Sequence, residues 1–570
     1  MDELPSSILF APFAEGLSEA EQINISHARA ETIGTRFSLT IDDMLKPSRK
    51  FWDMFRHNTV ILDGAATSLY SIQLNLAAGT LAPFVQQRPD LRPLMDDLLS
   101  SGFRVSGQYL LTEVGHGLDA PNLETTATLR ADGTFDLHTP HPGAAKFMPP
   151  TLPYGGVRRV GIVMARLMVE DEDRGIRPFI VTLNDGVEMC TGITAKALPS
   201  RGGSKAMGHA ITYFNHVILP PSALLGDISG VENPRRHFLQ TIWRVGVGSL
   251  SLSATVIPSL KASAYIAWKY SQRRCVTGRG GQPNPIISFR TQQIPILNAI
   301  SQAFVLDAFY EKACAWFVAI SQENIELRNA IATIAKATMI GHWNRSGTAI
   351  VDRCGAQGTF DVNQILNFVN EIRGVSIAEG DTLVLSIRLA SELLLRRYTV
   401  PEASYPDSLL ARHEQGMLEG LTSILLSTES HRGKTFNELI LPRCLPFVEA
   451  IGHRMAWEAA LAAGVPTPLV RLYELGAIEV DLAWYVEHGS ISGREEFWKV
   501  QSDAYNAVLE GMEDYVRRTG VAPYAVAPIV SEKSWDAYVS SLPSYGASST
   551  TSGVSRVEGS DSTDRILARL

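Results

Sequence analysis

A threonine, a glutamate, a histidine and two glycines stand within six residues of one another, and together they could bind a flat ligand. The segment is Thr112-Glu113-Val114-Gly115-His116-Gly117. Thr112 and Glu113 place a hydroxyl and a carboxylate just before a turn, and Gly115 and Gly117 allow a close approach of the backbone because glycine has no Cβ. Such a turn suits hydrogen bonding to the edge of a planar heterocycle. Because most short turns of this kind only reverse the chain, a structural and a ligand-binding role both stay open.

Helices are expected before this turn and strands after it. Apolar residues recur at helical spacing in several stretches before about residue 105: Phe51–His57, Ser68–Gly79 and Asp90–Ser101. Beyond Gly117 the pattern alternates and is β-branched, which predicts a hairpin and further strands. The hairpin comprises Thr125–Arg130, a turn at Ala131-Asp132-Gly133, and Thr134–Leu137; the later strands are Gly161–Val169, Ile176–Leu183 and Ile211–Ile218.

Helices return from about residue 232 and continue to the end of the ordered pattern. The expected helices are Phe238–Ser271, Arg290–Ser321, Asn324–Arg345 and Thr382–Arg397, the last with Asp381 or Thr382 as its N-cap. A proline-bearing break at Tyr398–Asp407 precedes a second helical block. One helical stripe in that block is typical of core packing: Tyr505, Val508, Leu509, Met512 and Val516.

The predicted fold class is therefore α+β, with a β unit between helical bundles. We place an N-terminal helical domain at 1–105, a β domain at 106–228, two further helical domains at 229–400 and 401–542, and a tail at 543–570. The junction between a β unit and helical bundles forms a crevice where ligands tend to bind. The Thr112 turn lies at the entrance to the β unit and hence next to this crevice.

Composition excludes some classes of function. The 570 residues contain 45% hydrophobic and 19% charged residues and carry a net charge of −8, which argues against a nucleic-acid-binding protein. Five cysteines without a CxxC pair favour a reduced compartment and core positions, and no zinc pattern or other metal site is expected. The N-terminus lacks the features of a secretory signal. The most apolar run, Val245–Leu260, is shorter and more polar than a membrane span and favours a buried helix.

The last three residues, Ala568-Arg569-Leu570, resemble the SKL-type peroxisomal address. A polar stretch rich in serine, glycine and threonine follows Pro543, and such a linker would present the tripeptide to a peroxisomal import receptor. The expected localisation is the peroxisome.

The longest motif identifies a family. Tyr109–Gly117 followed by Asn122–Thr128 resembles the TExGHG…LETTAT pattern of acyl-CoA oxidases, within the acyl-CoA dehydrogenase superfamily. Shorter pieces that resemble the family occur on both sides of this motif, in the family's order: Ile61–Ala65, Gly79-Thr80, Tyr270–Arg274, Thr291–Gln293, Cys354–Gly358, Glu379–Asp381, and Leu472–Leu475 with Trp484. The resemblance implies the acyl-CoA dehydrogenase/oxidase fold, FAD as cofactor and a fatty acyl-CoA as substrate. It also implies dehydrogenation to the trans-2-enoyl-CoA, reoxidation of the flavin by O2 to give H2O2, and a homodimer.

The resemblance also assigns residues. Glu379 matches the family's catalytic base, whose backbone N–H, with a ribityl hydroxyl of FAD, stabilises the enolate oxygen. Without the other motifs, a glutamate in front of a helix would be read as a solvated charge. Thr112 matches the residue that bonds the flavin ring, with Gly115 and Gly117 keeping the turn slim, whereas His116 is expected only to fix the loop.

A second group matches positions that contact the FAD of the neighbouring subunit. Arg273 and Gln292 correspond to the pyrophosphate and adenine side, and Arg274 is an equal candidate; the alternative for both arginines is a solvated helix end. Gly355 and Gly358 belong to a turn that resembles the family's CGGxG segment, with alanine and Gln357 as departures.

Other departures indicate a divergent member. Lys146–Thr151 reads Lys-Phe-Met-Pro-Pro-Thr where the family has Lys-Trp-Trp-Pro-Gly-Gly, Arg388 stands where a glutamine is expected, and Val526–Val530 matches the distal motif poorly. Two alternatives therefore stay open: an acyl-CoA dehydrogenase that reduces a carrier protein, and a non-catalytic acyl-CoA-binding or scaffold paralogue. Substrate-binding residues, chain length, branching and pathway are not specified by the sequence.

Overall fold

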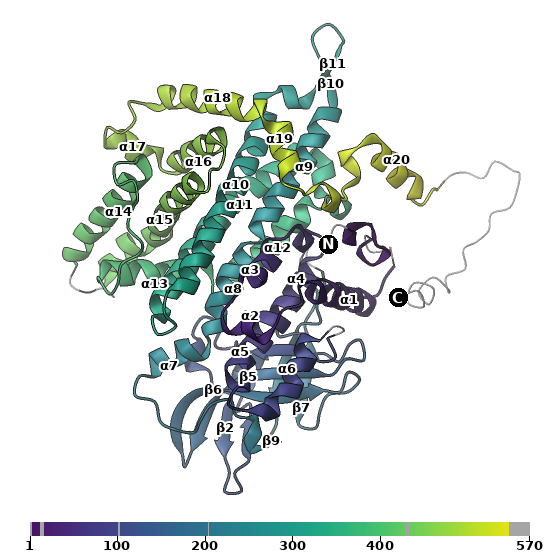
Figure 1. The fold of residues 1–570 in the computed structure, drawn as a ribbon, viewed down its shortest axis with the longest axis vertical. Coiled ribbons are helices and arrows are strands. Elements are labelled where there is room, and N and C mark those ends of the chain that lie inside the picture. Colours follow the sequence, from purple (N-terminus) through teal and green to yellow (C-terminus); the bar gives the residue numbers. More distant parts are fainter. Residues whose placement is uncertain are drawn as a thin grey trace, which may run out of the picture.

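The structure is a computed structural model that describes residues 3–11, 16–100, 103–202, 205–428, 430 and 433–545. A β unit lies at one end of the molecule, and long helices rise from it in Figure 1. The α+β class predicted from the sequence is confirmed. The tail, including Ala568, Arg569 and Leu570, lies outside the described residues.

The N-terminal part is helical and packs between the β unit and the longer helices. Its helices are α1 (Glu19–Phe37), α2 (Ile41–Leu45), α3 (Arg49–Arg56), α4 (Gly64–Tyr70), α5 (Gly79–Val85) and α6 (Arg92–Leu99), with a π-helix, η4 (Ser71–Ala78), between α4 and α5. The single helix expected at Ser68–Gly79 is therefore interrupted by wider turns, which often occur at functional sites.

The β unit contains two sheets. The larger has the order β1-β5-β2-β3-β9, with β6 also paired to β5, and the smaller has the order β4-β8-β7. Their strands are β1 (Ser106–Leu110), β2 (Thr126–Leu129), β3 (Phe135–His138), β4 (Lys146–Phe147), β5 (Arg159–Val169), β6 (Glu172–Asn184), β7 (Ile193–Ala197), β8 (Ala210–Phe214) and β9 (Val217–Leu219). The strand expected at Ile211–Ile218 is two strands, because a turn with His216 in the left-handed region separates β8 from β9 and sends them to different sheets.

The sheet topology explains where the Thr112 turn lies. β1 and β2 both run parallel to β5, pairing with its Arg159–Val163 and Arg166–Met168 segments, respectively. β6 pairs antiparallel with β5. The chain between β1 and β2 must therefore leave the sheet and return to it, and this excursion contains Thr112 and Gly117.

Beyond the β unit, the helices form two groups. The first consists of α7 (Pro234–Thr241), α8 (Trp243–Ser253), α9 (Val256–Arg273), α10 (Arg290–Ala319), α11 (Ile325–Arg353), α12 (Ile365–Ile377) and α13 (Thr382–Leu394), with a protruding hairpin, β10 (Cys275–Thr277) and β11 (Pro283–Pro285), after α9. The second comprises α14 (Leu409–Leu426), α15 (Leu441–Ala462), α16 (Thr467–Val480), α17 (Leu482–Glu487), α18 (Arg494–Glu510), α19 (Met512–Arg518) and α20 (Glu532–Ser541). The one helix expected at Phe238–Ser271 is three, α7 to α9.

The buried apolar side chains form two cores. A large core joins the N-terminal helices to α8–α13 and α15, and a smaller one fills the β unit between residues such as Val163, Phe179 and Phe214.

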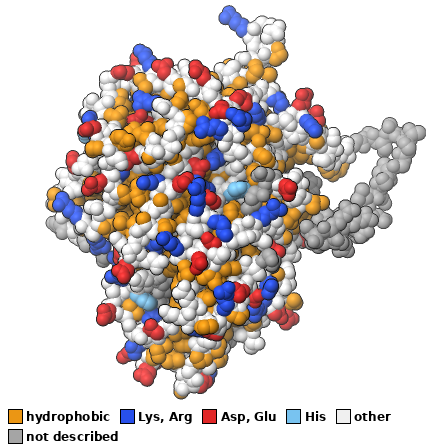
Figure 2. Space-filling model, viewed as in Figure 1, with side chains coloured by type: hydrophobic (Ala, Val, Ile, Leu, Met, Phe, Trp, Pro, Cys, Tyr) orange, Lys and Arg blue, Asp and Glu red, His pale blue; other side chains and the backbone are white. Residues whose placement is uncertain are grey.

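Trp243–Arg273 is long and apolar enough to span a membrane, but 83% of its most apolar window is buried in the protein. Three of the five cysteines are buried, whereas Cys275 is exposed on the hairpin, against the expectation of core positions. Positive and negative side chains are interspersed on the face shown in Figure 2.

Candidate active site

A cavity of about 2480 Å³ lies where the β unit meets the helices. Thr112 and Gly117 from the β1–β2 excursion line it, and Glu379 lines it from the junction of α12 and α13. Helices α4, α8, α9 and α12 and the π-helix η4 also contribute to the lining. The structure therefore brings the two halves of the predicted site, far apart in the sequence, to one cavity.

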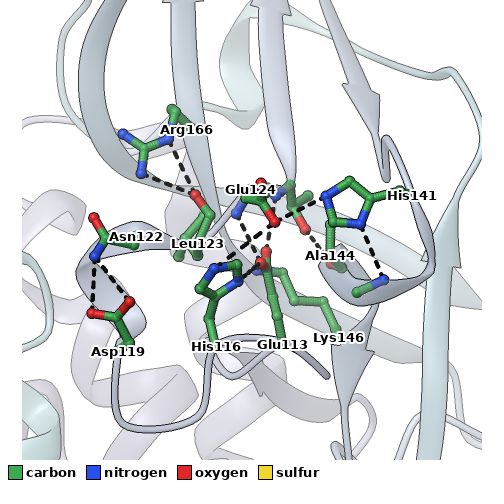
Figure 3. Close-up of polar contacts among 12 residues, drawn as sticks. Glu113, His116, Asp119, Asn122, Leu123, Glu124, His141, Ala144, Lys146 and Arg166 are labelled. Carbon is green, nitrogen blue, oxygen red and sulfur yellow. Dashed lines mark hydrogen bonds and ion pairs between the residues drawn. The ribbon is translucent and has the colours of Figure 1, made fainter.

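Glu113, whose carboxylate is buried, anchors the Thr112 turn. It accepts hydrogen bonds from the backbone N–H groups of Glu124 and Thr125 at 2.7 and 2.9 Å, and from Lys146 Nζ at 2.9 Å. His116 contacts the same carboxylate at 3.1 Å, as Figure 3 shows. This network ties the start of the excursion to its end, and His116 has the loop-fixing position expected for it.

The charges of this anchor support each other. Burial alone would raise the pKa of Glu113, but the Lys146 ammonium and the N–H groups of Glu124 and Thr125 outweigh it and lower the pKa. Burial lowers the pKa of Lys146 to about 8, although Glu113 opposes the shift. The pair is a buried ion pair with further hydrogen bonds, the condition under which such a pair is tolerated in a protein interior.

The three predicted residues of the turn have different surroundings. The carbonyl of Thr112 accepts a hydrogen bond from the N–H of Phe147 at 2.9 Å, which joins the turn to β4. A Cβ at Gly117 would meet open space, so the backbone there leaves room for a ligand. Gly115 instead faces Gly143, to whose carbonyl its N–H donates at 2.8 Å, and it lies outside the lining formed by the described residues.

Glu379 occupies the short connection between α12 and α13. Its φ of 57° lies in the left-handed region, an uncommon conformation for a residue with a side chain that is found at constrained sites. Asp381 caps α13 by accepting the N–H groups of Leu383 and Val384, so of the two expected N-caps the structure selects Asp381. Burial raises the pKa of Glu379 to about 8, although the nearby cations Lys336 and Arg244 act in the opposite direction.

These two cations were not identified from the sequence. Lys336 of α11 donates to the carbonyls of Ala378 and Gly380, and Arg244 of α8 donates to the carbonyl of Asn75. Burial lowers the pKa of Lys336 to about 8 and that of Arg244 to about 9, in each case against the attraction of Glu379. The available signal was a single charged residue within an apolar helical run, because such a charge is rarely buried without a partner.

The residues expected to contact a second subunit form another cluster. Gln292 of α10 donates to Ser271 Oγ of α9 and to the Arg353 carbonyl of α11, both at 2.8 Å. Arg273 donates to the Ile529 carbonyl, and Arg274 is exposed. The cluster lies outside the cavity lining formed by the described residues.

The turn after α11 completes this cluster. Gly355 has a φ of 59° with open space at its Cβ position, whereas a Cβ at Gly358 would collide with the backbone of Val351. Only Gly358 therefore has a packing reason within the chain, and Gly355 faces away from it.

The divergent segment Lys146–Thr151 contains one side chain that points into the protein and several that face the cavity. Lys146 points into the protein toward Glu113, whereas Phe147, Met148, Pro149 and Pro150 line the cavity. Arg388 also lines the cavity and forms an ion pair with Glu392 at 3.3 Å. The departures Phe147, Met148, Pro150 and Arg388 therefore face the ligand space, while the retained lysine is an anchor.

Fold and site together define a protein with the acyl-CoA oxidase architecture, a central β unit enclosed by helical domains. The chain superposes on acyl-CoA oxidase1 of Yarrowia lipolytica with a TM-score of 0.79, covering 94% of this chain and 88% of that one at 16% identity. It superposes on acyl-CoA oxidase-2 of Caenorhabditis elegans, in a structure bound with FAD, ascaroside-CoA and ATP, with a TM-score of 0.70, covering 93% and 96% at 16% identity.

Sequence comparison finds acyl-CoA oxidases as relatives. Residues 248–394 match the model of the acyl-CoA oxidase C-alpha1 domain. The chain is 27% identical over 320 residues to peroxisomal acyl-coenzyme A oxidase 1 of Arabidopsis thaliana, covering 52% of this chain and 47% of that protein. It is 26% identical over 332 residues to peroxisomal acyl-coenzyme A oxidase 2 of Rattus norvegicus, covering 54% and 47%. The chain is therefore similar in sequence to acyl-CoA oxidases, and it spans about half the length of the curated relatives it matches.

Proposed function

We propose that the protein is an FAD-dependent acyl-CoA oxidase that converts a fatty acyl-CoA to its trans-2-enoyl-CoA. The observation that carries this proposal is the placement of Glu379, a carboxyl group with a raised pKa, on the same cavity as the Thr112 turn. An α-proton of a thioester is weakly acidic, so its removal needs a base of suitable pKa and a donor for the developing oxyanion.

The cavity fits the cofactor and the substrate together. Sites for single drug-sized ligands measure roughly 300 to 1,000 Å³, and this cavity is more than twice the upper value. Thr112 and the open space beside Gly117 would hold the edge of the isoalloxazine ring, the flat part of FAD. When bound, FAD supplies the hydride acceptor for the substrate β-carbon.

The protein's own part is the handling of the α-proton. Glu379 takes the proton at its carboxylate, and its backbone N–H donates to the thioester oxygen as negative charge develops there. A pKa of about 8 makes this carboxylate a stronger base than an ordinary glutamate. The left-handed backbone at Glu379 sets the direction of both groups, the carboxylate and the N–H.

O2 is the proposed electron acceptor, with H2O2 as product. The similarity to acyl-CoA oxidases supports it, whereas the cavity-facing departures Phe147, Met148 and Pro150 favour keeping a second candidate, a dehydrogenase that passes electrons to a carrier protein. Peroxide release under air with each turnover supports the oxidase. Rapid dye reduction without oxygen, together with no peroxide under air, would identify the dehydrogenase. A purified protein that lacks flavin absorption would instead indicate the non-catalytic acyl-CoA-binding or scaffold paralogue.

The decisive experiment replaces the base. Glu379→Gln should bind FAD but reduce it at least about a thousandfold more slowly with a saturated acyl-CoA, because the amide has no basic lone pair of comparable strength. Glu449→Gln is the matched control: burial also raises the pKa of Glu449, which pairs with Arg345 and lies outside the cavity lining.

Another carboxyl group of the cavity lining, that of Glu371, competes for the role of base. Glu371 of α12 lines the same cavity, and burial, together with Asp63, raises its pKa to about 7. Unchanged reduction by Glu379→Gln with loss in Glu371→Gln would transfer the role to Glu371. A panel of acyl-CoA chain lengths scored by peroxide release would then define the substrate.

Localisation and assembly complete the proposal. We assign the protein to the peroxisome through Ala568, Arg569 and Leu570, in keeping with the peroxisomal names of its relatives. Deleting the three residues should leave a tagged protein in the cytosol, and continued import would refute the assignment. The proposed homodimer would bring Gln292, Gly355 and the Arg273–Arg274 pair to the partner's cofactor, which a crystal structure with FAD would reveal.

A further inference from the structure

The connection that carries Glu379 is held by a buried side chain from another helix. Lys336 lies in the middle of α11, between Ala335 and Ala337, and only 1% of its surface is exposed. Its Nζ donates to the Ala378 carbonyl and to the Gly380 carbonyl, each at 2.5 Å. These are the carbonyls of the two residues on either side of Glu379.

This geometry does not follow from helix packing alone. A lysine in an apolar helix interior loses its hydration, and an ammonium is normally kept there only by strong acceptors or by a negative charge. Here the acceptors are two main-chain carbonyls of a non-helical connection, and Glu379 between them has a left-handed φ of 57°. The ammonium thus holds the two peptide units on either side of Glu379 in place. Without it, the strain of a left-handed φ at a residue with a side chain would favour another conformation of this connection.

We propose that Lys336 is a positioning residue for Glu379: it clamps the two flanking carbonyls and so fixes the direction from which the carboxylate and the backbone N–H enter the cavity. This inference rests on the proposed role of Glu379 as the base. Lys336 does not need to touch the substrate, because it acts through the main chain of Ala378–Gly380.

The clamp also places a positive charge next to the base. The charged and titratable groups that face Glu379 are Lys336 from α11, Arg244 from α8 and Tyr109 from β1, and Asp381 follows on its own connection. Lys336 and Arg244 lower the pKa of Glu379 against the larger effect of burial, which raises it. Because Glu379 and Lys336 interact, the measured pKa values belong to the pair.

Arg244 has a different attachment. It donates to the carbonyls of Asn75 and Met44, in the N-terminal helical part, at 2.8 and 2.9 Å. It therefore contributes charge near the base without holding the connection itself. Lys336 thus positions the connection of Glu379, whereas Arg244 acts on Glu379 through its charge.

The test uses three substitutions of the same lysine. Lys336→Met removes both the charge and the donors, Lys336→Gln keeps a donor without the charge, and Lys336→Arg keeps the charge. Lys261→Met is the matched control, because Lys261 is a largely buried lysine of α9 that pairs with Asp307 at 2.7 Å and lies outside the cavity lining.

The first readout is independent of catalysis. Amide hydrogen exchange in the protein without substrate should speed up roughly tenfold or more in the segment 376–382 of Lys336→Met, since the local opening is no longer opposed by the clamp. Lys261→Met should leave that segment unchanged. Equal exchange in wild type and Lys336→Met would overturn the proposal.

The second readout is the pH profile of flavin reduction in a single turnover. Loss of the cation raises the pKa of Glu379, so the midpoint should move to higher pH by about half a unit or more in Lys336→Met and Lys336→Gln and stay near wild type in Lys336→Arg. The limiting rate should fall about 100-fold, as for a misplaced reacting group, with acyl-CoA affinity nearly unchanged. An unshifted midpoint in a folded Lys336→Gln protein would overturn the electrostatic part.

The two proposals fail in different ways. If wild type binds FAD but never reduces it with any acyl-CoA, the proposed function fails, while hydrogen exchange still tests the clamp. If wild type is active and Lys336→Gln matches it in exchange, rate and pH midpoint, the clamp fails and the proposed function stands. Should Lys336→Met not fold, the comparison of Lys336→Gln with Lys336→Arg decides both readouts.

Discussion

Gly248 of α8 allows the carboxyl group of Glu379 to approach the helix, and an added methyl group would displace it. A Cβ built at Gly248 would lie 2.5 Å from Glu379 Cδ and 2.6 Å from Oε1. It would also lie 2.7 Å from Asn75 Nδ2. Non-bonded carbon atoms settle at roughly 3.5 to 4.0 Å, so Gly248→Ala must move the carboxyl group by about 1 Å.

The structure gives a magnitude for activity and another for stability. A displacement of about 1 Å in a reacting group lowers the rate of the chemical step roughly 100-fold. Overpacking costs about 1 to 3 kcal/mol, and alanine in a helix interior returns about 1 kcal/mol relative to glycine. Gly248→Ala should therefore remain folded, about 0 to 2 kcal/mol less stable than wild type, while its flavin reduction is severely slowed.

The assay is anaerobic single-turnover flavin reduction with a saturated acyl-CoA, alongside denaturant unfolding. Gly246→Ala, on the same helix α8, is the control, because a Cβ there would crowd the side chain of Asn329 of α11 without reaching Glu379. Gly246→Ala should share the stability change and keep the rate. A reduction rate of Gly248→Ala within about threefold of wild type would show that the carboxyl group does not act from this position.

Two further predictions concern the buried charges. Glu113→Gln should destabilise the protein by about 3 to 5 kcal/mol and weaken FAD binding, because Lys146 would be left buried without its carboxylate; denaturant unfolding and flavin release measure the two effects, and unchanged values of both would contradict the anchor role. Because the folded-state pKa of Glu379 is raised to about 8, the native state holds a proton that the unfolded chain releases near pH 4.5, so this group lowers stability as pH rises from about 4.5 to 8. Glu379→Gln should therefore gain stability relative to wild type across that window, and a constant difference between pH 5 and 9 would argue against a raised pKa.

The sequence predicted the fold class from its hydrophobic periodicity, and the two walls of the cavity from motifs that resemble those of acyl-CoA oxidases. The Thr112 turn and Glu379 each lie in segments whose residue order resembles the family's, and the structure brings both to one cavity. Strand boundaries were harder. Ile211–Ile218 has the pattern of one β-branched strand. The left-handed backbone at His216 divides it into two strands, and that turn depends on which sheet each half joins.

The partners of the two supporting charges could not be predicted because they are carbonyl groups. Lys336 bonds Ala378 and Gly380 through main-chain oxygens, and Arg244 does the same with Asn75, so no complementary side chain marks either contact in the sequence. A main-chain acceptor is present at every residue, and only the three-dimensional path of the chain selects the one used.

The same distinction explains how the chain can diverge without losing the site. On the β side, Lys146 is kept and holds Glu113 inside the protein, while Phe147 and Met148, which face the cavity, depart from the family pattern. On the helical side, Lys336 holds the connection of Glu379 from behind, away from the ligand space. Changes of cavity-facing side chains therefore alter the packing against flavin and substrate but leave both anchors in place. The divergence should appear as altered acyl specificity or oxygen reactivity, with the proton-abstracting geometry retained.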